Sequence, residues 1–357
     1  MTSIKSIGYN VEIGKNSLKQ LSKFISKSNY SAFYIMADEN TNEYCMSILL
    51  KHAPQLANAN VFEIESGESN KVLEVASNIW QTLLESNADK NALLINLGGG
   101  MISDLGGFIA SVYKRGIDFI NVPTSLLAMA DASVGGKNGI DFGGIKNSIG
   151  TITQPKAVFV YTEFIETLPK QQVYNGMAEV YKMGLIADKK YWQLLSLTDF
   201  TDNMEQVIAH SIYLKNQIVK LDPFDKKQRK ALNFGHSMGH AIEALSLGSK
   251  DELLHGEAII IGMIMEAHIS YQKKLLTKSQ LDEILNTFFD IFEPVQLKIK
   301  NNNDILSLIK NDKKNAKGKS LFTLLHGIGK CRVDAEVTEK EIVNAINYYT
   351  KLKAWAS

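Results

Sequence analysis

The sequence contains very little cysteine and no long hydrophobic run. Its two cysteines, Cys45 and Cys331, cannot build the disulfide framework of a small secreted protein. Residues 1–10 lack the apolar core of a secretion signal, and no apolar stretch is long enough to span a membrane. We therefore expect a cytoplasmic chain with no membrane partner.

An excess of charge of one sign is also lacking, and arginine is rare. The formal net charge is +1, which gives no general attraction to nucleic acid, so no nucleic-acid partner is expected. Of the 39 lysines and arginines, only Arg115, Arg229 and Arg332 are arginine. A planar guanidinium grips a carboxylate or phosphate in two places, which lysine cannot do. These arginines are therefore candidates for anion binding.

What is present is the composition of a globular protein, with 357 residues of which 45% are hydrophobic and 22% charged. This length is sufficient for two domains. In the first half, apolar runs alternate with helical patterns. Strands are expected at residues 32–37, 61–64, 92–97, 120–123 and 158–160, and helices around 18–25, 72–83 and 102–113. Such alternation predicts a parallel sheet.

Two glycine-rich segments interrupt this pattern. Gly98-Gly99-Gly100 joins a strand to a helix, where free backbone amides can cradle a phosphate, although a tight turn without a ligand fits equally well. The run from 135 to 150 contains Lys137, Lys146 and Asn147. It is either a surface loop or a lid whose lysines meet a substrate phosphate, and we favour the lid.

After Leu168-Pro169 the patterns are almost all helical, and one predicted helix, residues 227–247, carries a polar stripe. The stripe consists of residues at steps of four, three, four and three: Arg229, Asn233, His236, His240 and Glu243. The remaining surface of this helix is apolar, so the stripe should line a site. Gly235 and Gly239 beside it are expected where a ligand or another backbone comes close.

Histidines cluster in the same region. His236 and His240 are one helical turn apart, and His255 follows, so spacing favours the first two as ligands of a divalent metal such as zinc, with a hydrogen-bonded core pair as the alternative. Glu179 could supply a carboxylate ligand, with Lys182 one turn later. Lys215 occupies an apolar row of another helix, where a lysine is costly unless it meets an anion.

Taken in order, these residues resemble the 3-dehydroquinate synthases, of the sugar-phosphate cyclase superfamily. The resemblance runs from about Asp38 to Lys314. It passes through Gly98-Gly99-Gly100-x-x-x-Asp104, Arg115-Gly116, Pro123-Thr124-x-Leu126-Leu127, Asp131-x-Ser133-Val134-Gly135-Gly136-Lys137, Lys146-Asn147, Glu179-x-x-Lys182, Arg229-x-x-Leu232-Asn233-x-Gly235-His236-x-x-Gly239-His240-Ala241-x-Glu243 and His255-Gly256-Glu257.

The resemblance implies two domains and a specific reaction. Residues 1–168 would form an α/β, Rossmann-like NAD-binding domain, and residues 169–357 an all-α metal-binding domain, with the active site in the cleft and the chain a homodimer. The implied reaction converts 3-deoxy-D-arabino-heptulosonate 7-phosphate, a sugar phosphate, to 3-dehydroquinate and phosphate. It uses catalytic NAD and a divalent metal, zinc or cobalt.

The resemblance also assigns residues. The metal ligands would be Glu179, His236 and His255, which gives His240 to the substrate, unlike the spacing argument. Positions matching NAD contacts are Asp38, Asn40, Glu68, Lys71, Gly99, Gly100, Met101, Asp104, Thr124, Ser125, Asp131, Lys137, Lys146 and Thr167. Positions matching substrate and phosphate contacts are Arg115 (which in the family reaches the partner subunit's site), Lys137, Lys146, Asn147, Lys182, Lys215, Arg229, Asn233, His240 and Lys314 or its neighbour Lys313.

The sequence departs from the family pattern at a few positions. Ser125 and Asn138 stand where threonine is usual, Asp225 stands where glutamate is usual, and residues 148–153 lack the customary aromatic. The three substitutions keep a polar group of similar kind. We therefore expect them to affect rate or cofactor affinity more than the type of reaction.

Three other functions share part of this pattern. A sister cyclase would act on sedoheptulose 7-phosphate or glucose 6-phosphate, which lack the carboxylate that Arg229 and Lys215 would bind. An iron- or zinc-dependent alcohol dehydrogenase of similar architecture would accumulate NADH. An inactive paralogue that only binds NAD would need a broken site, yet every charged position is filled.

Overall fold

The computed structural model describes residues 2–143, 145–197, 203–297, 301–310 and 320–356. The chain divides into two compact units. Unit 1 comprises Met1–Gly176 with Asn203–Asn216, and unit 2 comprises Met177–Asp202 with Gln217–Ser357. The predicted domain boundary after residue 168 stays a prediction.

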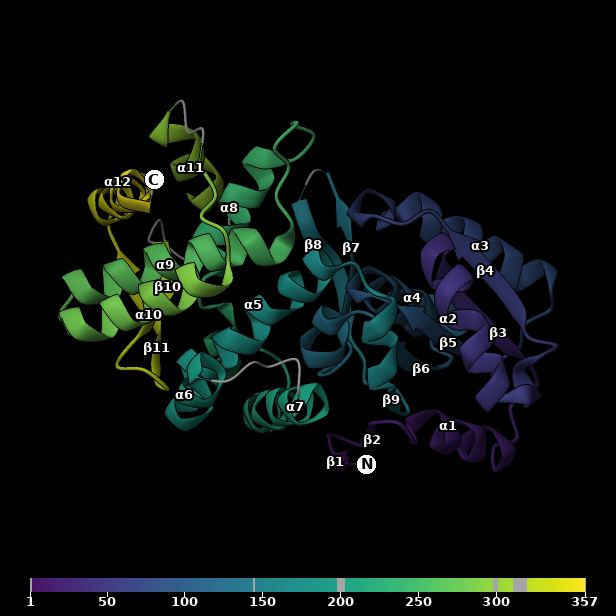
Figure 1. Cartoon of the computed structure of the whole chain (residues 1–357). Coiled ribbons are helices and arrows are strands. Elements are labelled where there is room, and N and C mark those ends of the chain that lie inside the picture. Colours follow the sequence, from purple (N-terminus) through teal and green to yellow (C-terminus); the bar gives the residue numbers. More distant parts are fainter. Residues whose placement is uncertain (1, 144, 198–202, 298–300, 311–319, 357) are drawn as a thin grey trace. The chain divides into compact units, whose positions relative to one another are not determined.

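A seven-stranded sheet forms the centre of unit 1 (Figure 1). Its strands lie in the order β1 (Thr2–Lys5), β2 (Asn10–Ile13), β9 (Val158–Val160), β6 (Asp118–Pro123), β5 (Leu93–Gly98), β3 (Phe33–Asp38) and β4 (Asn60–Ile64). All neighbours pair in parallel except β1 and β2. The five predicted strands and the parallel sheet are confirmed.

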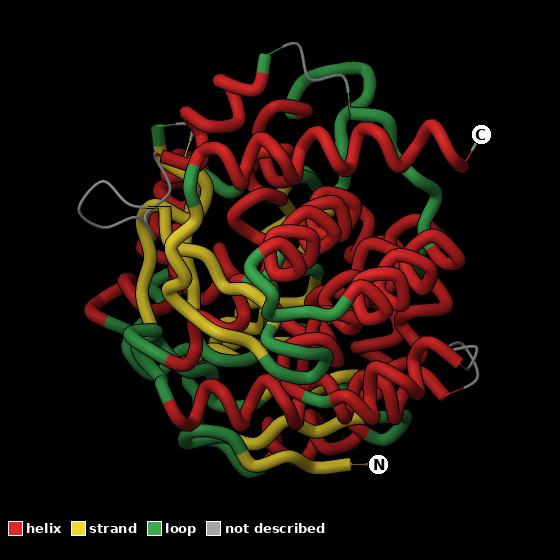
Figure 2. The backbone as a smooth tube through the Cα atoms, turned by 90° about the vertical axis from the view of Figure 1, so that its left-hand side faces the viewer, coloured by secondary structure: helices red, strands yellow, loops and turns green. Residues whose placement is uncertain are grey.

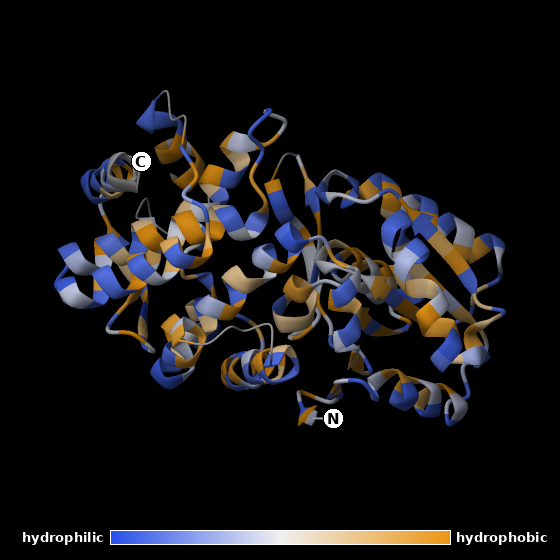
Figure 3. Ribbon diagram, in the orientation of Figure 1, coloured by the Kyte–Doolittle hydropathy of each residue, from blue (hydrophilic) through white to orange (hydrophobic). Residues whose placement is uncertain are grey.

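Helices follow the strands of unit 1 as the alternating pattern predicts. They are α1 (Ser17–Ser26), α2 (Glu39–His52), α3 (Leu73–Glu85) and α4 (Gly100–Val112), with short helical turns η1 (Pro54–Leu56), η2 (Glu68–Asn70), η3 (Tyr113–Arg115), η4 (Ala128–Ala132) and η5 (Thr162–Thr167). Every residue of β5 is buried, whereas the helices carry both hydrophilic and hydrophobic residues (Figure 3). The apolar faces of the helices therefore close the core over the sheet.

The glycine-rich segment after residue 135 is not a loop. It forms an antiparallel hairpin of β7 (Lys137–Phe142) and β8 (Ile145–Ile152), so the expectation of a surface loop was wrong, and the role of its lysines as a lid over a substrate phosphate stays a prediction. Gly139 lies opposite Gly150, and a Cβ on Gly150 would lie 2.3 Å from the carbonyl oxygen of Asn138. The glycines therefore permit close strand pairing.

Unit 2 is helical, as predicted, with one additional two-stranded sheet. Its elements are α6 (Lys189–Leu197), η7 (Gln228–Asn233), α8 (His236–Ser246), α9 (His255–Gln272), α10 (Lys278–Ile291), α11 (Asn302–Lys310), the hairpin β10 (Ser320–Leu325) and β11 (Cys331–Val337), and α12 (Glu339–Ala356), which runs to the C-terminus in Figure 2. Helices α5 (Lys170–Ala187) and α7 (Met204–Leu221) contribute to both units. Within the described ranges, no helix combines the length and apolarity needed to cross a bilayer.

The prediction of a single helix over residues 227–247 was wrong. The 3₁₀ helix η7 and the α-helix α8 are separated at Phe234 and Gly235, and Gly235 has a φ of +80°. A Cβ on Gly235 would lie 2.4 Å from Cγ of Met263, and a Cβ on Gly262 would lie 2.0 Å from the carbonyl oxygen of Gly235. The glycines here accommodate the backbone of α9, which was one of the two expectations, and the turn needs the left-handed conformation that glycine adopts readily.

Candidate metal and dinucleotide sites

Three side chains of unit 2 converge around one carboxylate oxygen. Glu179 lies on α5, and His236 and His255 are the first residues of α8 and α9. Oε1 of Glu179 lies 3.5 Å from Nε2 of His236 and 3.6 Å from Nε2 of His255. Glu179 is buried, and this oxygen has no hydrogen-bond partner among the described residues.

These donors fit a divalent cation. Two ligand atoms about 2.1 Å from a zinc ion, at a tetrahedral angle, lie about 3.4 Å apart. The two separations from Glu179 Oε1 are close to that value, and one ligand atom from each residue lies within 4.8 Å of the others. A buried carboxylate oxygen without a hydrogen bond, facing two imidazole nitrogens, is the arrangement that a bound cation would complete.

Neighbouring charges orient this donor set. Nζ of Lys182 contacts the other oxygen, Oε2, of Glu179, and both side chains are almost fully buried. Oε1 of Glu243, on α8, lies 3.5 Å from Nδ1 of His255. A carboxylate on the far nitrogen of a ligating histidine fixes its ring orientation. Burial lowers the pKa of His255, but the carboxylates of Glu179 and Glu243 outweigh it and raise the pKa to about 9.

His240 belongs to a different group of donors. Its ring centroid lies 5.1 Å from that of His236, but its ligand atoms group with Glu243 and His255 rather than with Glu179. Helical spacing, which favoured His236 and His240 as the ligand pair, does not describe either group. The set Glu179, His236 and His255 is the one that the family resemblance implies.

Arg229 and Asn233 lie on η7, outside α8. Arg229 is only 2% exposed, and its Nη1 donates to the carbonyl oxygen of Pro223 at 3.0 Å. Asp222, just after α7, accepts hydrogen bonds from the backbone N–H groups of Lys226, Lys227 and Arg229 at 3.0, 2.6 and 3.1 Å. Although burial opposes the shift, these bonds lower the pKa of Asp222. An ionised, buried carboxylate therefore shapes the turn that holds Arg229.

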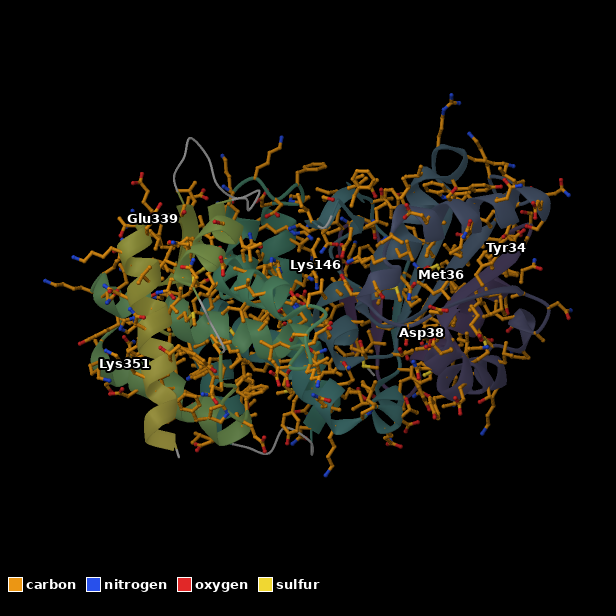
Figure 4. The ribbon with its side chains drawn as sticks, turned by 90° about the horizontal axis from the view of Figure 1, so that it is seen from above. Tyr34, Met36, Asp38, Lys146, Glu339 and Lys351 are labelled. Carbon is orange, nitrogen blue, oxygen red and sulfur yellow. The ribbon has the colours of Figure 1, made fainter. Side chains whose placement is uncertain are left out.

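In unit 1, several candidate NAD residues lie at the carboxyl ends of the parallel strands. The chain leaves β3 for β4 and leaves β5 for β6 in opposite directions, so a topological switch point lies between β3 and β5. Tyr34, Met36 and Asp38 follow one another along β3 in Figure 4, and Asp38 ends the strand and caps α2 through the N–H of Thr41 at 2.8 Å. Dinucleotides bind at such switch points in open α/β sheets.

Further candidate NAD residues follow the ends of β5 and β6 at the same edge of the sheet. Gly98 ends β5, Gly99 caps α4, and Gly100 begins it, so the predicted strand–glycine–helix turn is present. Thr124 follows β6, and its N–H donates to the carbonyl oxygen of Gly98 at 3.0 Å. Next to it, Oγ of Ser125 accepts from the N–H of Ala128 at 3.3 Å, so this departure from threonine keeps a local hydrogen bond.

The buried Lys71 and the partly buried Asp104 form an ion pair in the same unit. Nζ of Lys71 lies 2.7 Å from Oδ2 of Asp104 and 3.4 Å from Oε1 of Glu68. Burial lowers the pKa of Lys71, but these carboxylates outweigh it and hold the pKa above its usual value. Met101, on the first turn of α4, is partly buried. Three of the residues implied for NAD, Glu68, Lys71 and Asp104, are therefore linked by charge in unit 1.

A second buried lysine of unit 1 also lies beside a carboxylate. Nζ of Lys215, on α7, lies 2.9 Å from Oδ1 of Asp131 and donates to the carbonyl oxygen of Asp131 at 2.7 Å. Lys215 is 5% exposed, so the unusual lysine on an apolar row is explained by this partner. Both residues were implied as site residues, and the structure brings them together.

The remaining candidates are more exposed. Arg115, with a φ of 68°, ends η3 and is exposed, as are Asn40, Lys137 and Asn147, while Lys146 is partly buried. The N–H of Asn147 donates to Oδ1 of Asp141 at 2.7 Å, and Oγ1 of Thr167 donates to the carbonyl oxygen of Phe164 at 2.7 Å. Lys313 and Lys314 lie outside the described residues.

Asn138 and Asp225, the other two polar substitutions relative to the family pattern, form hydrogen bonds with nearby backbone groups. Asn138 is buried, and its Nδ2 donates to the carbonyl oxygens of Gly136 at 3.0 Å and Thr153 at 2.9 Å. Asp225 has a φ of 57°, and its N–H donates to the carbonyl oxygen of Asp222 at 3.3 Å. Asn138 thus braces the β7–β8 hairpin, and Asp225 belongs to the turn before η7.

Comparison with known proteins decides the family. Family models described as 3-dehydroquinate synthase N-terminal and C-terminal match residues 61–175 and 176–315. The chain belongs to the 3-dehydroquinate synthase family. The 3-dehydroquinate synthase of Parabacteroides distasonis is 36% identical over 95% of this chain and 97% of its own length. That of Clostridium tetani is 37% identical over 90% of this chain and 86% of its own.

Solved structures share the fold of this family member. A 2-deoxy-scyllo-inosose synthase complexed with carbaglucose-6-phosphate, NAD⁺ and Co²⁺ has a TM-score of 0.87 at 23% identity, covering 97% of this chain and 100% of that chain. A 2-epi-5-epi-valiolone synthase from Streptomyces hygroscopicus with NAD⁺ and Zn²⁺ bound has a TM-score of 0.85 at 24% identity, with coverage of 98% and 99%. An iron-containing alcohol dehydrogenase is less similar, with a TM-score of 0.64 at 12% identity and coverage of 98% and 99%.

Sequence reasoning missed two buried carboxylates beside these sites. Asp222 shapes the turn before Arg229, and Glu266 on α9 accepts hydrogen bonds at the start of α8. A signal was present for Glu266, because it is an isolated acidic residue in an apolar helical run. Asp222 lies before a proline in a polar segment and gave no such signal.

Proposed function

We propose that this chain is a 3-dehydroquinate synthase that converts 3-deoxy-D-arabino-heptulosonate 7-phosphate to 3-dehydroquinate and phosphate. The observation that carries the proposal is the donor set of buried Glu179 and partly buried His236 and His255 in a chain that belongs to this family throughout both halves. The sheet edge of unit 1, with its glycine turn, supports NAD as the cofactor.

The two cofactors supply the reactive chemistry. A divalent cation held by Glu179, His236 and His255, zinc or cobalt, supplies a Lewis acid for substrate hydroxyls, and NAD supplies a reversible hydride acceptor. The protein keeps the imidazole nitrogens aimed at the metal position. Lys182 neutralises the oxygen of Glu179 that the histidines do not face.

Other residues bind and orient the substrate. We assign the carboxylate to Arg229, with Lys215 assisting, because a guanidinium matches a planar anion in two places. Lys137, Lys146 and Asn147 are assigned to the phosphate, where lysine ammonium groups stabilise the negative charge of the leaving group. His240 and Asn233 are assigned to substrate hydroxyls, which they can orient by hydrogen bonding.

The compartment, the pathway and the oligomeric state belong to the same proposal. We propose that the chain acts in the cytoplasm, in the shikimate pathway of aromatic amino acid biosynthesis, and as a homodimer to which Arg115 contributes from the partner. The exposed position of Arg115 supports this role. Sedimentation at micromolar concentration should give twice the mass of the chain, and a monomer that is fully active would contradict the dimer.

One assay separates this function from its rivals. The protein is incubated with the heptulosonate phosphate, Co²⁺ and a trace of NAD, while phosphate and NADH are followed. We expect many equivalents of phosphate per NAD with no accumulation of NADH, because the reaction involves no net oxidation. Accumulating NADH would indicate an alcohol dehydrogenase.

A sister cyclase is the second candidate, because its fold is shared at a TM-score of 0.87. The same assay with sedoheptulose 7-phosphate or glucose 6-phosphate tests it. Preference for either substrate would change the proposed function to that of a sister cyclase, since neither substrate carries the carboxylate that we expect Arg229 to bind.

A further inference from the structure

The proposed function assigns no role to Glu266, a buried carboxylate on α9. Glu266 is 0% exposed, and every residue from Ala258 to Ser270 is buried. Moving a carboxylate from water into such a setting costs several kcal/mol unless strong hydrogen bonds replace its hydration. The partners of Glu266 should therefore indicate what the residue does.

Those partners surround a proposed metal ligand. Oε2 of Glu266 accepts from the N–H of Gly235 at 2.6 Å, and Oε1 accepts from those of Ser237 and Met238, each at 3.1 Å. These groups flank His236, the first residue of α8. The first N–H groups of a helix have no partner within the helix and attract negative charge. Both oxygens of Glu266 are thus bound to the backbone on either side of His236.

The same backbone turn sets the orientation of the His236 ring. Nδ1 of His236 lies 3.1 Å from the carbonyl oxygen of Phe234. A proton on Nδ1 is donated to that oxygen, which leaves the lone pair of Nε2 facing Oε1 of Glu179 at 3.5 Å. A shift of the turn at Gly235 would therefore move the carbonyl that holds the ring.

Glu266 also joins the two histidine-bearing helices. It belongs to α9, which begins at His255, and it holds the first turn of α8, which begins at His236. The helices are in backbone contact beside it, because a Cβ on Gly262 would lie 2.0 Å from the carbonyl oxygen of Gly235 and 2.6 Å from the N atom of Gly239. The relative placement of the two imidazoles depends on this junction.

We propose that Glu266 is a positioning residue of the metal site, which anchors the first turn of α8 so that His236 and His255 face the same oxygen of Glu179. The inference rests on the proposed function, because it takes these three residues as metal ligands. Glu266 is not a member of the donor group of Glu179, His236 and His255. It acts before the metal arrives, by holding the ligand geometry in the metal-free protein.

The first experiment measures Co²⁺ affinity and the visible spectrum of the Co²⁺ complex for Glu266→Gln in the full chain. The glutamine keeps the shape but turns an amide NH₂ toward N–H donors, so affinity should fall about 10- to 100-fold and the spectrum should change. Ser270→Ala is the matched control. Its hydroxyl is buried on the same helix and bonds to the carbonyl oxygen of Glu266 and the N–H of Leu325, away from α8. It should bind Co²⁺ as wild type does.

Wild-type Co²⁺ affinity in Glu266→Gln would overturn the proposal. Failure of the wild-type protein to bind Co²⁺ would instead overturn the proposed metal site, so the two failures are distinguishable.

A second measurement requires no variant. In metal-free wild-type protein, amide hydrogens of Ser237 and Met238 should exchange as slowly as in the Co²⁺ complex, because Glu266 already binds them. Fast exchange that slows only when Co²⁺ is added would show that the metal orders the turn. That result would overturn the proposal even if Glu266→Gln does not fold.

Discussion

At the scale of single residues, both sites contain buried lysines that have specific carboxylate partners. Lys71 meets Asp104, Lys215 meets Asp131, and Lys182 contacts Glu179. Removing one member of such a pair leaves the other charge buried and uncompensated, which costs more than the pair contributes. Variants at these positions should therefore be judged against their unfolding free energy as well as their activity.

The two histidines of α8 should differ in their effect on metal binding. His236→Ala removes a donor that faces Glu179 and should reduce metal affinity by more than about 100-fold, since even supporting residues cost 10- to 100-fold. His240→Ala should retain the metal and lose turnover, because its ring groups with Glu243 instead. Metal content after dialysis measures both. Equal loss of metal in the two variants would favour the spacing argument over the donor set described above.

Arg229 should decide which cyclase reaction the chain performs. Truncating a buried charge that pairs with the substrate carboxylate costs about 2–5 kcal/mol, so Arg229→Ala should cut kcat/KM for the heptulosonate phosphate by roughly 30-fold to several thousand-fold. Arg229→Lys should recover only part of this, because an ammonium cannot form the two-pronged contact. Metal content should remain at the wild-type level in both. Normal turnover by Arg229→Ala would give this arginine a purely structural role.

At the scale of elements, helix ends place the functional groups. His236 and His255 begin α8 and α9, Gly99 caps α4, and Asp38 caps α2. The first N–H groups of a helix have no partner within the helix. At the start of α8 they donate to the carboxylate of Glu266, and at the start of α4 they lie at the carboxyl edge of the sheet. The sites are thus defined by where helices start.

The positions at which helices begin are also where prediction from the sequence succeeded least. Strands β3, β4, β5, β6 and β9 and helices α1, α3 and α4 have clear apolar periods, so the pattern located them, whereas β1, β2, α2 and the β7–β8 hairpin were not predicted. The break at Gly235 could not be seen, because helical spacing continues through it and the turn lies against α9, which the local sequence does not reveal. Spacing also could not choose between His236 and His240, since the choice depends on where Glu179 on α5 comes to lie. The resemblance supplied that assignment.

The junction of α9 and α12 should make stability depend on pH. His268 is 8% exposed and stacks on Tyr348, with ring centroids 3.8 Å apart. Burial, with a smaller effect of Lys278, lowers the pKa of His268 to about 4. Between its ordinary pKa of about 6.5 and 4, the unfolded chain binds a proton that the folded chain does not. Stability should therefore be lost as pH falls through this window.

Urea unfolding at pH 7.5 and pH 5 measures the effect. His268 should account for about 2 kcal/mol of the difference in unfolding free energy, since one pKa unit corresponds to about 1.4 kcal/mol. His268→Phe, which keeps a ring against Tyr348, should remove that part. His326→Gln, at an exposed histidine of the same unit, should leave it. An unchanged pH dependence in His268→Phe would contradict the assignment.

At the scale of the whole molecule, each compact unit contains one candidate cofactor site. The NAD candidates that the structure links by charge and hydrogen bonds, including Lys71 and Asp104, belong to unit 1. Glu179, His236 and His255 belong to unit 2. The reaction needs both cofactors, so a defect in either unit should abolish turnover while leaving the other cofactor bound.

Paired variants can test this separation. Lys71→Met removes the cation beside Asp104 and should weaken NAD binding at least about 30-fold, because loss of a buried charge partner costs about 2 kcal/mol or more. Its Co²⁺ affinity should equal that of wild type. His236→Ala should show the reverse, with Co²⁺ lost and NAD affinity retained. Fluorescence titration with NADH and Co²⁺ absorption measure the two affinities in the same samples. If Lys71→Met loses Co²⁺, or His236→Ala loses NADH, the two sites depend on shared structure and cannot be assigned to separate units.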